Sequence, residues 1–211
     1  MLYVRSSLER ANESRREMEA VNVKLLKQSE TDQMTGLANR YRLNAYSEKV
    51  LDYCYEHRLP LAMEILDIDF FKQYNDNYGH QQGDECIIAI ANELKKMEDG
   101  QTFCARYGGD EFIIIYAGIS AEEVYAKAGA LRQNIMNLKL EHLYSNALPI
   151  VTISQGISYG VPEEGNRSWD FLHTADMLLY QVKKRSRNDI CIADIRGQEL
   201  DLSSKQEKVE P

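Results

Sequence analysis

The sequence is poor in the residues that build disulfide frameworks, zinc sites and membrane spans. Only four of its 211 residues are cysteine. They lie far apart, without a CxxC pair, at Cys54, Cys86, Cys104 and Cys191. Such spacing excludes a disulfide scaffold and a zinc site and predicts reduced thiols in a cytoplasmic protein. No apolar run approaches the roughly 18 residues that cross a bilayer, and the charged N-terminus lacks the apolar core of a signal peptide.

Positive charge is also scarce, because 25 Lys and Arg stand against 33 Asp and Glu, for a net charge of -8. An acidic surface repels a phosphate backbone, so we expect no nucleic-acid partner. A mononucleotide remains compatible with this charge if a metal ion and a few local cations offset it. The proportions of hydrophobic residues, 44%, and charged residues, 27%, are ordinary for a globular domain.

The first 28 residues contain no Pro or Gly, and their apolar residues follow an alternating 3-4 spacing. This spacing predicts a coiled-coil stalk; an amphipathic helix folded back on the domain is the alternative. Six of its eight seam positions are apolar, the exceptions being Arg15 and Asn22; the eight are Met1, Val4, Leu8, Ala11, Arg15, Met18, Asn22 and Leu25. Residues 29–195 have the pattern of one domain, and residues 196–211 are polar and predicted to be disordered. An upstream sensor or membrane region would make the chain the cytoplasmic part of a receptor.

Within the domain, helical and strand periodicities alternate along the chain, which predicts an α+β fold with one sheet and packed helices. The predicted helices are 40–57, 76–97, 121–138 and 169–184. The predicted strands are 61–67, 102–106, 111–117, 149–158 and 189–193.

Two acidic segments are candidate metal sites. Asp67 and Asp69 follow a buried strand and point to the same face, so either carboxylate could bind a divalent cation. The second segment, Gly108-Gly109-Asp110-Glu111, joins two strands, and a Gly-Gly turn tolerates positive φ and close approach of a phosphate. Taken alone, the first is more often a polar strand end and the second an ordinary turn.

Two further segments carry groups that suit a nucleotide. Between Asn75 and Asp84, amide and carboxylate side chains match the donors and acceptors of guanine, although a loop with a helix cap has the same composition. The basic run 183–187 could neutralise a triphosphate, or simply complement the helix dipole at a solvated helix end.

Together, four segments resemble, in their order along the chain, the GGDEF-domain family of diguanylate cyclases. In chain order they are DQMTGLANR at 32–40, DIDFFKQYNDNYGHQQGD at 67–84, the signature RYGGDEF at 106–112 and ADMLLYQVKKRSRN at 175–188. Met34 and Ser186 depart from the usual Leu and Gly of the family pattern. The resemblance spans residues 30–193 and implies a nucleotidyl-cyclase or palm-like domain with a central five-stranded mixed sheet flanked by helices.

The resemblance also implies roles for individual residues. Asp67, Asp110 and the Ile68 carbonyl would hold Mg²⁺, or Mn²⁺, and Glu111 would be a further ligand or proton acceptor. Lys72 would stabilise the reacting phosphates. The remaining substrate-binding positions would be Phe70, Phe71, Asn75, His80, Asp84, Gly108, Gly109, Lys183 and Arg187. The implied activity is condensation of two GTP molecules into cyclic di-GMP across a homodimer, because each domain holds one GTP.

One departure concerns product feedback. Many family members carry an Arg-x-x-Asp product site just before the signature, whereas Asp99 and Thr102 occupy those positions here. We therefore expect no allosteric product site. Two alternatives to the implied activity are a catalytically silent domain that binds GTP and regulates a partner, and a cyclase that makes a mixed purine dinucleotide. The carboxylate of Asp84 favours guanine over adenine.

Overall fold

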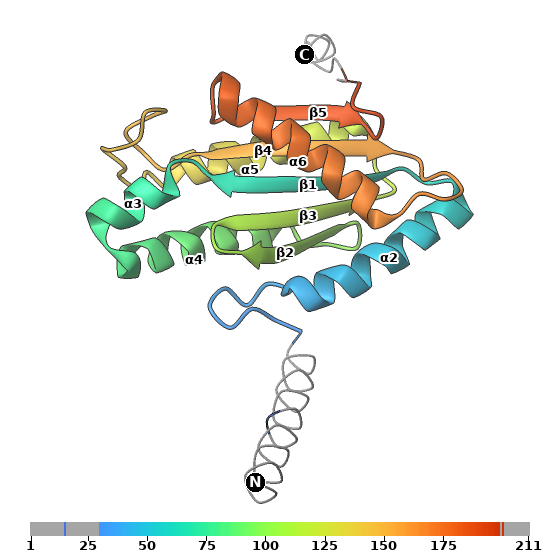
Figure 1. The fold of residues 1–211 in the computed structure, drawn as a ribbon, viewed down its shortest axis with the longest axis horizontal. Coiled ribbons are helices and arrows are strands. Elements are labelled where there is room, and N and C mark those ends of the chain that lie inside the picture. Colours follow the sequence, from blue (N-terminus) through green and yellow to red (C-terminus); the bar gives the residue numbers. More distant parts are fainter. Residues whose placement is uncertain (1–14, 16–29, 199, 201–211) are drawn as a thin grey trace, which may run out of the picture.

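The computed structural model describes residues 15, 30–198 and 200, and its centre is a five-stranded sheet (Figure 1). The strands lie in the order β2-β3-β1-β4-β5. β1 is antiparallel to β3 and β4, and β4 is parallel to β5, so the sheet is mixed. The predicted α+β class and five-stranded mixed sheet are confirmed. The strands are β1 Leu61–Ile68, β2 Thr102–Gly108, β3 Glu111–Ala117, β4 Ile153–Gly160 and β5 Ile190–Asp194.

Helices cover both faces of the sheet, because the buried side chains of the central strand alternate between two cores. Leu61 and Met63 of β1 pack with α2 and α6 on one face, and Ala62 and Leu66 pack with α3, α4 and α5 on the other. Figure 1 shows α6 crossing β1 and β4 on the near side, with α4 and α5 behind the sheet. The helices are α2 Arg40–His57, α3 Phe71–Tyr78, α4 His80–Met97, α5 Ala121–Asn137 and α6 Ser168–Arg185. Across the described ranges, none of these helices has the length and apolarity of a bilayer span.

Two predicted elements differ from the structure. The single helix expected over 76–97 is two helices, α3 and α4, because the chain turns at Gly79 with φ +86°. The strand expected over 149–158 begins at Ile153, because Val151 donates its N–H to Leu140 in the preceding loop. The other predicted bounds lie within two residues of the observed ones.

Both predicted terminal segments fall largely outside the described residues. The stalk prediction for 1–28 therefore stays a prediction. At the other end, disorder was expected from residue 196. Instead, the described part of that segment is tied to β5, since Asp194 donates its N–H to Gln198 and Leu200 donates its N–H to Ile192.

Helix α6 touches the sheet through its backbone at one glycine. A Cβ placed at Gly156 in β4 would lie 2.2 Å from the Ala175 carbonyl oxygen and 2.3 Å from the Leu179 nitrogen. Both atoms belong to the α6 backbone, which cannot rotate away as a side chain would. The missing side chain at Gly156 therefore sets how closely α6 approaches the sheet.

A carboxylic acid lies in the core on the opposite face of β1. Glu64 is fully buried and accepts hydrogen bonds from the Tyr116 hydroxyl at 2.8 Å and from Gln155 Nε2 at 2.7 Å. Burial raises the pKa of Glu64 to about 7, although both hydrogen bonds oppose the shift. The Gln155 Oε1 atom is buried without a hydrogen-bond partner among the described residues.

We expect Glu64→Gln to stabilise the domain at alkaline pH. The folded-state pKa of Glu64, about 7, exceeds its ordinary value of 4.5. The contribution of the protonated Glu64 side chain to the free energy of unfolding is therefore fully present below pH 4.5 and is lost as the pH rises through 7. From this difference the variant should gain up to about 3 kcal/mol at pH 8 and little at pH 4.5. Its new amide can also donate to the Gln155 oxygen. Urea unfolding at the two pH values measures the effect; an equal shift at both would contradict it.

Candidate active site

The predicted acidic residues meet at one end of β1. Asp67 faces Glu111 across the β1–β3 ladder, and such directly opposed residues point to the same side of the sheet. That side is covered by α6, whose Lys183 Nζ lies 2.7 Å from Asp67 Oδ2. Asp110 occupies the turn that precedes Glu111. The structure therefore brings Asp67, Glu111 and Lys183 together, with Asp110 alongside.

The turn that carries Asp110 is held by an arginine of the signature. Gly109 has φ +54°, a left-handed conformation that suits glycine. The Arg106 side chain donates from Nε and Nη2 to the Gly109 carbonyl at 3.1 and 2.8 Å. Its Nη1 atom also lies 3.2 Å from Asp32 Oδ1, in the segment before α2. Arg106 thus connects the turn to the N-terminal segment that precedes α2, a role that the motif alone did not indicate.

The second carboxylate of the Asp67–Asp69 pair has a structural role. Asp69 is fully buried, and its oxygens accept from the Thr152 hydroxyl at 2.7 Å and the Ser154 hydroxyl at 2.6 Å. It also accepts from the backbone N–H of Asn188 at 3.0 Å. Its hydrogen-bonding capacity is used within the protein, so Asp67 is the member of the pair available to a cation.

Phe70 and Phe71 form the turn from β1 into α3, where the backbone was predicted to bind phosphate. Phe70 has φ +57°, and the Arg187 guanidinium lies over its ring at 4.3 Å. The carbonyl of Phe70 accepts from His142 Nε2 at 3.2 Å. Lys72 is exposed on the first turn of α3.

Sequence reasoning missed His142, which is fully buried in the loop between α5 and β4. Burial lowers its pKa, and its Nδ1 atom has no partner in the described part of the chain. The neutral ring therefore carries its proton on Nε2 and donates it to Phe70. A lone histidine in a loop of irregular sequence gives no pattern from which this contact could be predicted.

The predicted guanine-binding residues lie on the neighbouring helices α3 and α4. Asn75 is partly buried on α3, and its Oδ1 atom is buried without a partner among the described residues. A Cβ at Gly83 would lie only 1.8 Å from this oxygen, so glycine is needed beside it. His80 and Asp84 are exposed on the first turns of α4. Asn75 Oδ1 and the exposed Asp84 carboxylate are both hydrogen-bond acceptors, the kind of group that pairs with the N–H donors of a base.

Negative charge accumulates at the end of β1. Burial raises the pKa of Asp67 to about 6; Lys183 opposes the shift, and the neighbouring charges of Asp110 and Glu111 add to it. Burial likewise raises the pKa of Glu111; Lys183 opposes this shift too, while Asp110 and Asp176 add to it. Each acid is thus destabilised in its charged form mainly by burial and further by the neighbouring carboxylates, a condition that a bound cation relieves.

This oxygen-rich cluster fits a magnesium ion in chemical type. Asp67, Asp110 and the Ile68 carbonyl offer hard oxygen ligands, and the Lys183 ammonium already occupies a cation position against Asp67. Across the described ranges, no three His, Cys, Asp or Glu side chains form a complete metal site. Mg²⁺ commonly binds through one or two carboxylates and completes its shell with water and substrate phosphates, so the residues present fit such an ion.

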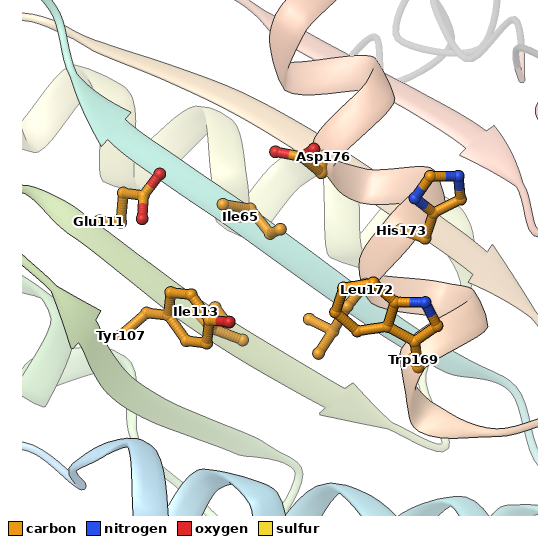
Figure 2. A pocket seen from close by; sticks show the side chains of 8 residues that line it. All are labelled: Ile65, Tyr107, Glu111, Ile113, Trp169, Leu172, His173 and Asp176. Atoms are coloured by element: carbon orange, nitrogen blue, oxygen red, sulfur yellow. The ribbon is translucent and has the colours of Figure 1, made fainter.

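A groove of about 210 Å³ begins at Glu111 and extends over β1 and β3 along one side of α6 (Figure 2). Its floor is apolar, and Figure 2 shows Glu111 at one end, Asp176 at mid-length and Trp169 with His173 at the other end. The lining residues are Ile65, Tyr107, Glu111, Ile113, Trp169, Leu172, His173 and Asp176.

The positions of the family's product site are engaged within the chain. Lys127 Nζ on α5 lies 2.9 Å from Asp99 Oδ2 and 3.0 Å from the Thr102 hydroxyl. This contact holds the pKa of Asp99 at about 2, with the Lys127 hydrogen bond as the main cause. Asp99 is therefore a charged carboxylate at the position where the family places a guanidinium.

The fold and the acidic cluster define a domain of the nucleotidyl cyclase class. Comparison with known proteins specifies the family: residues 29–189 match "Diguanylate cyclase, GGDEF domain", and the chain belongs to this family.

Among curated relatives, the probable diguanylate cyclase DgcC of Escherichia coli K12 is 35% identical over 163 residues, covering 76% of this chain and 42% of DgcC. The response regulator PleD of Caulobacter vibrioides is 31% identical over 160 residues, covering 76% of this chain and 35% of PleD. The chain thus spans less than half the length of either relative.

Among solved structures, the GGDEF domain of DgcB from Caulobacter crescentus, in complex with c-di-GMP, superimposes with a TM-score of 0.71. It is 30% identical, and the match covers 78% of this chain and 93% of that one. A DgcB structure that includes its coiled coil matches with a TM-score of 0.72 and 26% identity, covering 90% of this chain and 99% of that chain.

Proposed function

We propose that this domain is an active diguanylate cyclase that condenses two GTP into cyclic di-GMP and two pyrophosphates with Mg²⁺, or Mn²⁺, as cofactor. The observation that carries the proposal is the convergence of Asp67, Asp110 and Glu111 beside Lys183. Silent members of such a family would be expected to lose these acids, and all of them are present here.

The chemistry requires the 3′-hydroxyl of one GTP to attack the α-phosphorus of the other, with pyrophosphate leaving. Asp67, Asp110 and the Ile68 carbonyl would hold the metal, which supplies charge neutralisation and acidifies the hydroxyl. Glu111 or Asp110 would accept the hydroxyl proton, and burial, with the nearby charges of Asp110 and Asp176, raises the pKa of Glu111 above its ordinary value, which makes it a stronger base.

The basic residues and glycines would hold the phosphates. Lys72, Lys183 and Arg187 supply the cations, and the Phe70–Phe71 turn supplies backbone N–H groups at the start of α3. Gly108 and Gly109 leave open space, because a Cβ at either position would have no neighbour within 4 Å. A phosphate or ribose can therefore approach this backbone closely.

The decisive experiment is incubation with GTP and Mg²⁺ followed by chromatography of the products. Formation of cyclic di-GMP supports the proposal. GTP binding without turnover at any protein concentration would favour the alternative, a silent regulatory module.

Guanine selection should depend on Asp84, with Asn75 and His80 completing the pocket. A carboxylate accepts from the N1 and N2 donors of guanine but faces the N1 acceptor of adenine. An unpaired buried polar group costs about 1–3 kcal/mol, so we expect GTP to be preferred over ATP by ten- to a hundredfold. Asp84→Ala should remove most of this preference and leave Mg²⁺ dependence unchanged. Competition binding with both nucleotides measures it; equal competition by ATP in the wild type would contradict the assignment.

Catalysis should require two copies of the domain, because each site holds one GTP. The matching DgcB structure includes a coiled coil, which supports a stalk over residues 1–28 as the dimerising device. An upstream sensor or membrane region would act through this stalk.

Product feedback at the usual position should be weak or absent. The Asp99 carboxylate repels the phosphates of cyclic di-GMP where an arginine would attract them, and Lys127 already binds both Asp99 and Thr102. At saturating GTP, we expect added cyclic di-GMP to leave the initial rate nearly unchanged. Strong inhibition that GTP does not relieve would show that product binds another surface.

A further inference from the structure

Backbone strain is concentrated around the turn from β1 into α3. Phe70 has φ +57°, and Arg187 and Asn188, with φ +52° and +45°, lie against the same turn. The Arg187 guanidinium covers the Phe70 ring, and the Asn188 N–H donates to Asp69, the residue before Phe70. These are three of the five non-glycine residues with positive φ in the described ranges. Such conformations persist only where surrounding contacts fix them, and they cluster at functional sites.

Two hydrogen bonds fix the carbonyl of Phe70. It accepts from the Tyr74 N–H at 3.0 Å, the first bond of α3, and from His142 Nε2 at 3.2 Å. The Tyr74 bond lies within α3, whereas the His142 bond comes from the loop between α5 and β4. Of the two, it is therefore the His142 bond that ties this carbonyl to another part of the domain.

The surroundings of His142 suit this one contact. The side chain is fully buried, and its Nδ1 atom has no hydrogen-bond partner among the described residues. Its ring packs edge-on against Tyr74 and Tyr78, with centroid distances of 5.1 and 6.3 Å. An unpartnered buried nitrogen is costly, so an apolar side chain would fill this position at least as well for packing alone. What an apolar side chain cannot supply is the Nε2–H donor.

The peptide between Phe70 and Phe71 carries the effect of this contact to the other side of the turn. In a planar trans peptide the C=O and the following N–H point in opposite directions, and this peptide is trans. A hold on the Phe70 carbonyl therefore also sets the direction of the Phe71 N–H. This N–H is the first of α3, so it points out of the helix N-terminus and has no partner within the helix.

We propose that His142 is a positioning residue that aims the Phe71 N–H at a nucleotide phosphate by holding the Phe70 carbonyl. The proposal rests on the proposed function, which puts the phosphates at this turn. Lysine and arginine side chains can change rotamer to follow a phosphate, but a backbone N–H has only the direction of its peptide plane. Loss of the His142 bond should therefore weaken phosphate binding even with Lys72 and Arg187 in place.

Nucleotide binding by the full chain tests this role. His142→Leu removes the donor and keeps a side chain of similar volume, and His142→Gln places an amide nitrogen near the position of Nε2. The probe is a GTP analogue with a non-hydrolysable α–β bridge, in the presence of Mg²⁺. Its dissociation constant should rise about three- to tenfold in His142→Leu, as expected for one hydrogen bond. In His142→Gln it should stay within about twofold of the wild-type value, because the amide restores the donor.

His57→Leu is the matched control. His57 also bonds a backbone carbonyl, since its Nδ1 atom lies 2.9 Å from the Tyr53 carbonyl oxygen. This contact is exposed near the end of α2, which lies at the opposite end of the sheet from α3 (Figure 1). The His57→Leu protein should bind the analogue with wild-type affinity.

Guanosine separates positioning from a general disturbance of α3. Asn75, which is proposed to read guanine, lies on the same helix, so a distorted α3 would weaken guanosine and the analogue together. We expect His142→Leu to keep the wild-type affinity for guanosine, followed by NMR titration. His142→Phe is a second donor-free variant that keeps an aromatic ring in the core, and it should show the same selective loss.

Three outcomes overturn the proposal. They are an unchanged affinity for the analogue in the donor-free variants, an equal loss of affinity for guanosine, and an equal loss in His142→Gln. None of these measurements requires turnover. A wild type that shows the expected pattern but forms no cyclic di-GMP would refute the proposed function and support the role of His142. Turnover with unchanged affinity in both donor-free variants would do the reverse.

Discussion

Asp110→Ala should abolish formation of cyclic di-GMP, with a loss of at least about a thousandfold. Asp110 is a proposed metal ligand, and a metal supplies several kcal/mol of transition-state stabilisation, with each 1.36 kcal/mol worth tenfold in rate. The fold should persist, because Asp110 lies in a partly exposed turn whose backbone is held by the Arg106 side chain. Initial rates at saturating GTP and Mg²⁺ measure the loss, and circular dichroism checks the fold.

The matched control is Asp52→Ala, an exposed acid on α2 far from the proposed chemistry, which should leave the rate unchanged. The Mg²⁺ dependence of GTP affinity is a second measurement. It should weaken in the Asp110→Ala variant if Asp110 binds the metal, and it should stay unchanged if Asp110 only supports the turn. Activity of the Asp110 variant within a fewfold of wild type would show that the metal assignment is wrong.

Gly156→Ala should destabilise the domain by about 3 kcal/mol or more. The added Cβ would lie 2.2 Å from the Ala175 carbonyl oxygen and 2.9 Å from the Leu179 Cα, both in the α6 backbone. The helix must move off the sheet, and overpacking of a filled core costs about 1–3 kcal/mol and occasionally more. At roughly 2–4 °C per kcal/mol for a domain of this size, thermal unfolding should begin about 6–12 °C lower.

Gly129→Ala on α5 is the matched control. A Cβ there has no neighbour within 4 Å, so the same substitution removes a helix-weakening glycine and should stabilise by about 0.5–1 kcal/mol. Opposite signs for the two variants are the expected pattern. A Gly156→Ala protein that unfolds at the wild-type temperature would mean that α6 is not seated as described.

Local patterns predicted much of this fold because its elements are regular. Composition and hydrophobic period are enough to predict the buried β1 strand, the helix 40–57 and the glycine turn. The break at Gly79 was missed because helical residues continue on both sides of it, so the period alone gives no boundary. The start of β4 was placed too early because the apolar pattern begins at residue 149, yet Ile150 and Val151 pair with the preceding loop and not with the sheet.

The candidate site was predicted where its residues are close in sequence and missed where they are not. Asp67 and Asp69 look equivalent in the sequence; only tertiary contacts with Thr152, Ser154 and Asn188 assign Asp69 to the scaffold. Contacts such as these form only when the sheet and loops bring distant segments together, so residue spacing within a motif cannot predict them.

Arg106 links two parts of the molecule whose equilibria must then be coupled. Its planar guanidinium holds Gly109 in the turn that carries Asp110 and also Asp32 in the segment before α2. Coupling between two sites is reciprocal: if a change at Asp32 reorders the turn, a ligand that orders the turn must protect the Asp32 segment by the same free energy. Nucleotide binding should then slow backbone amide exchange at residues 32–38. By reciprocity, the size of this protection equals the free energy with which a change in the Asp32 segment would act on the turn.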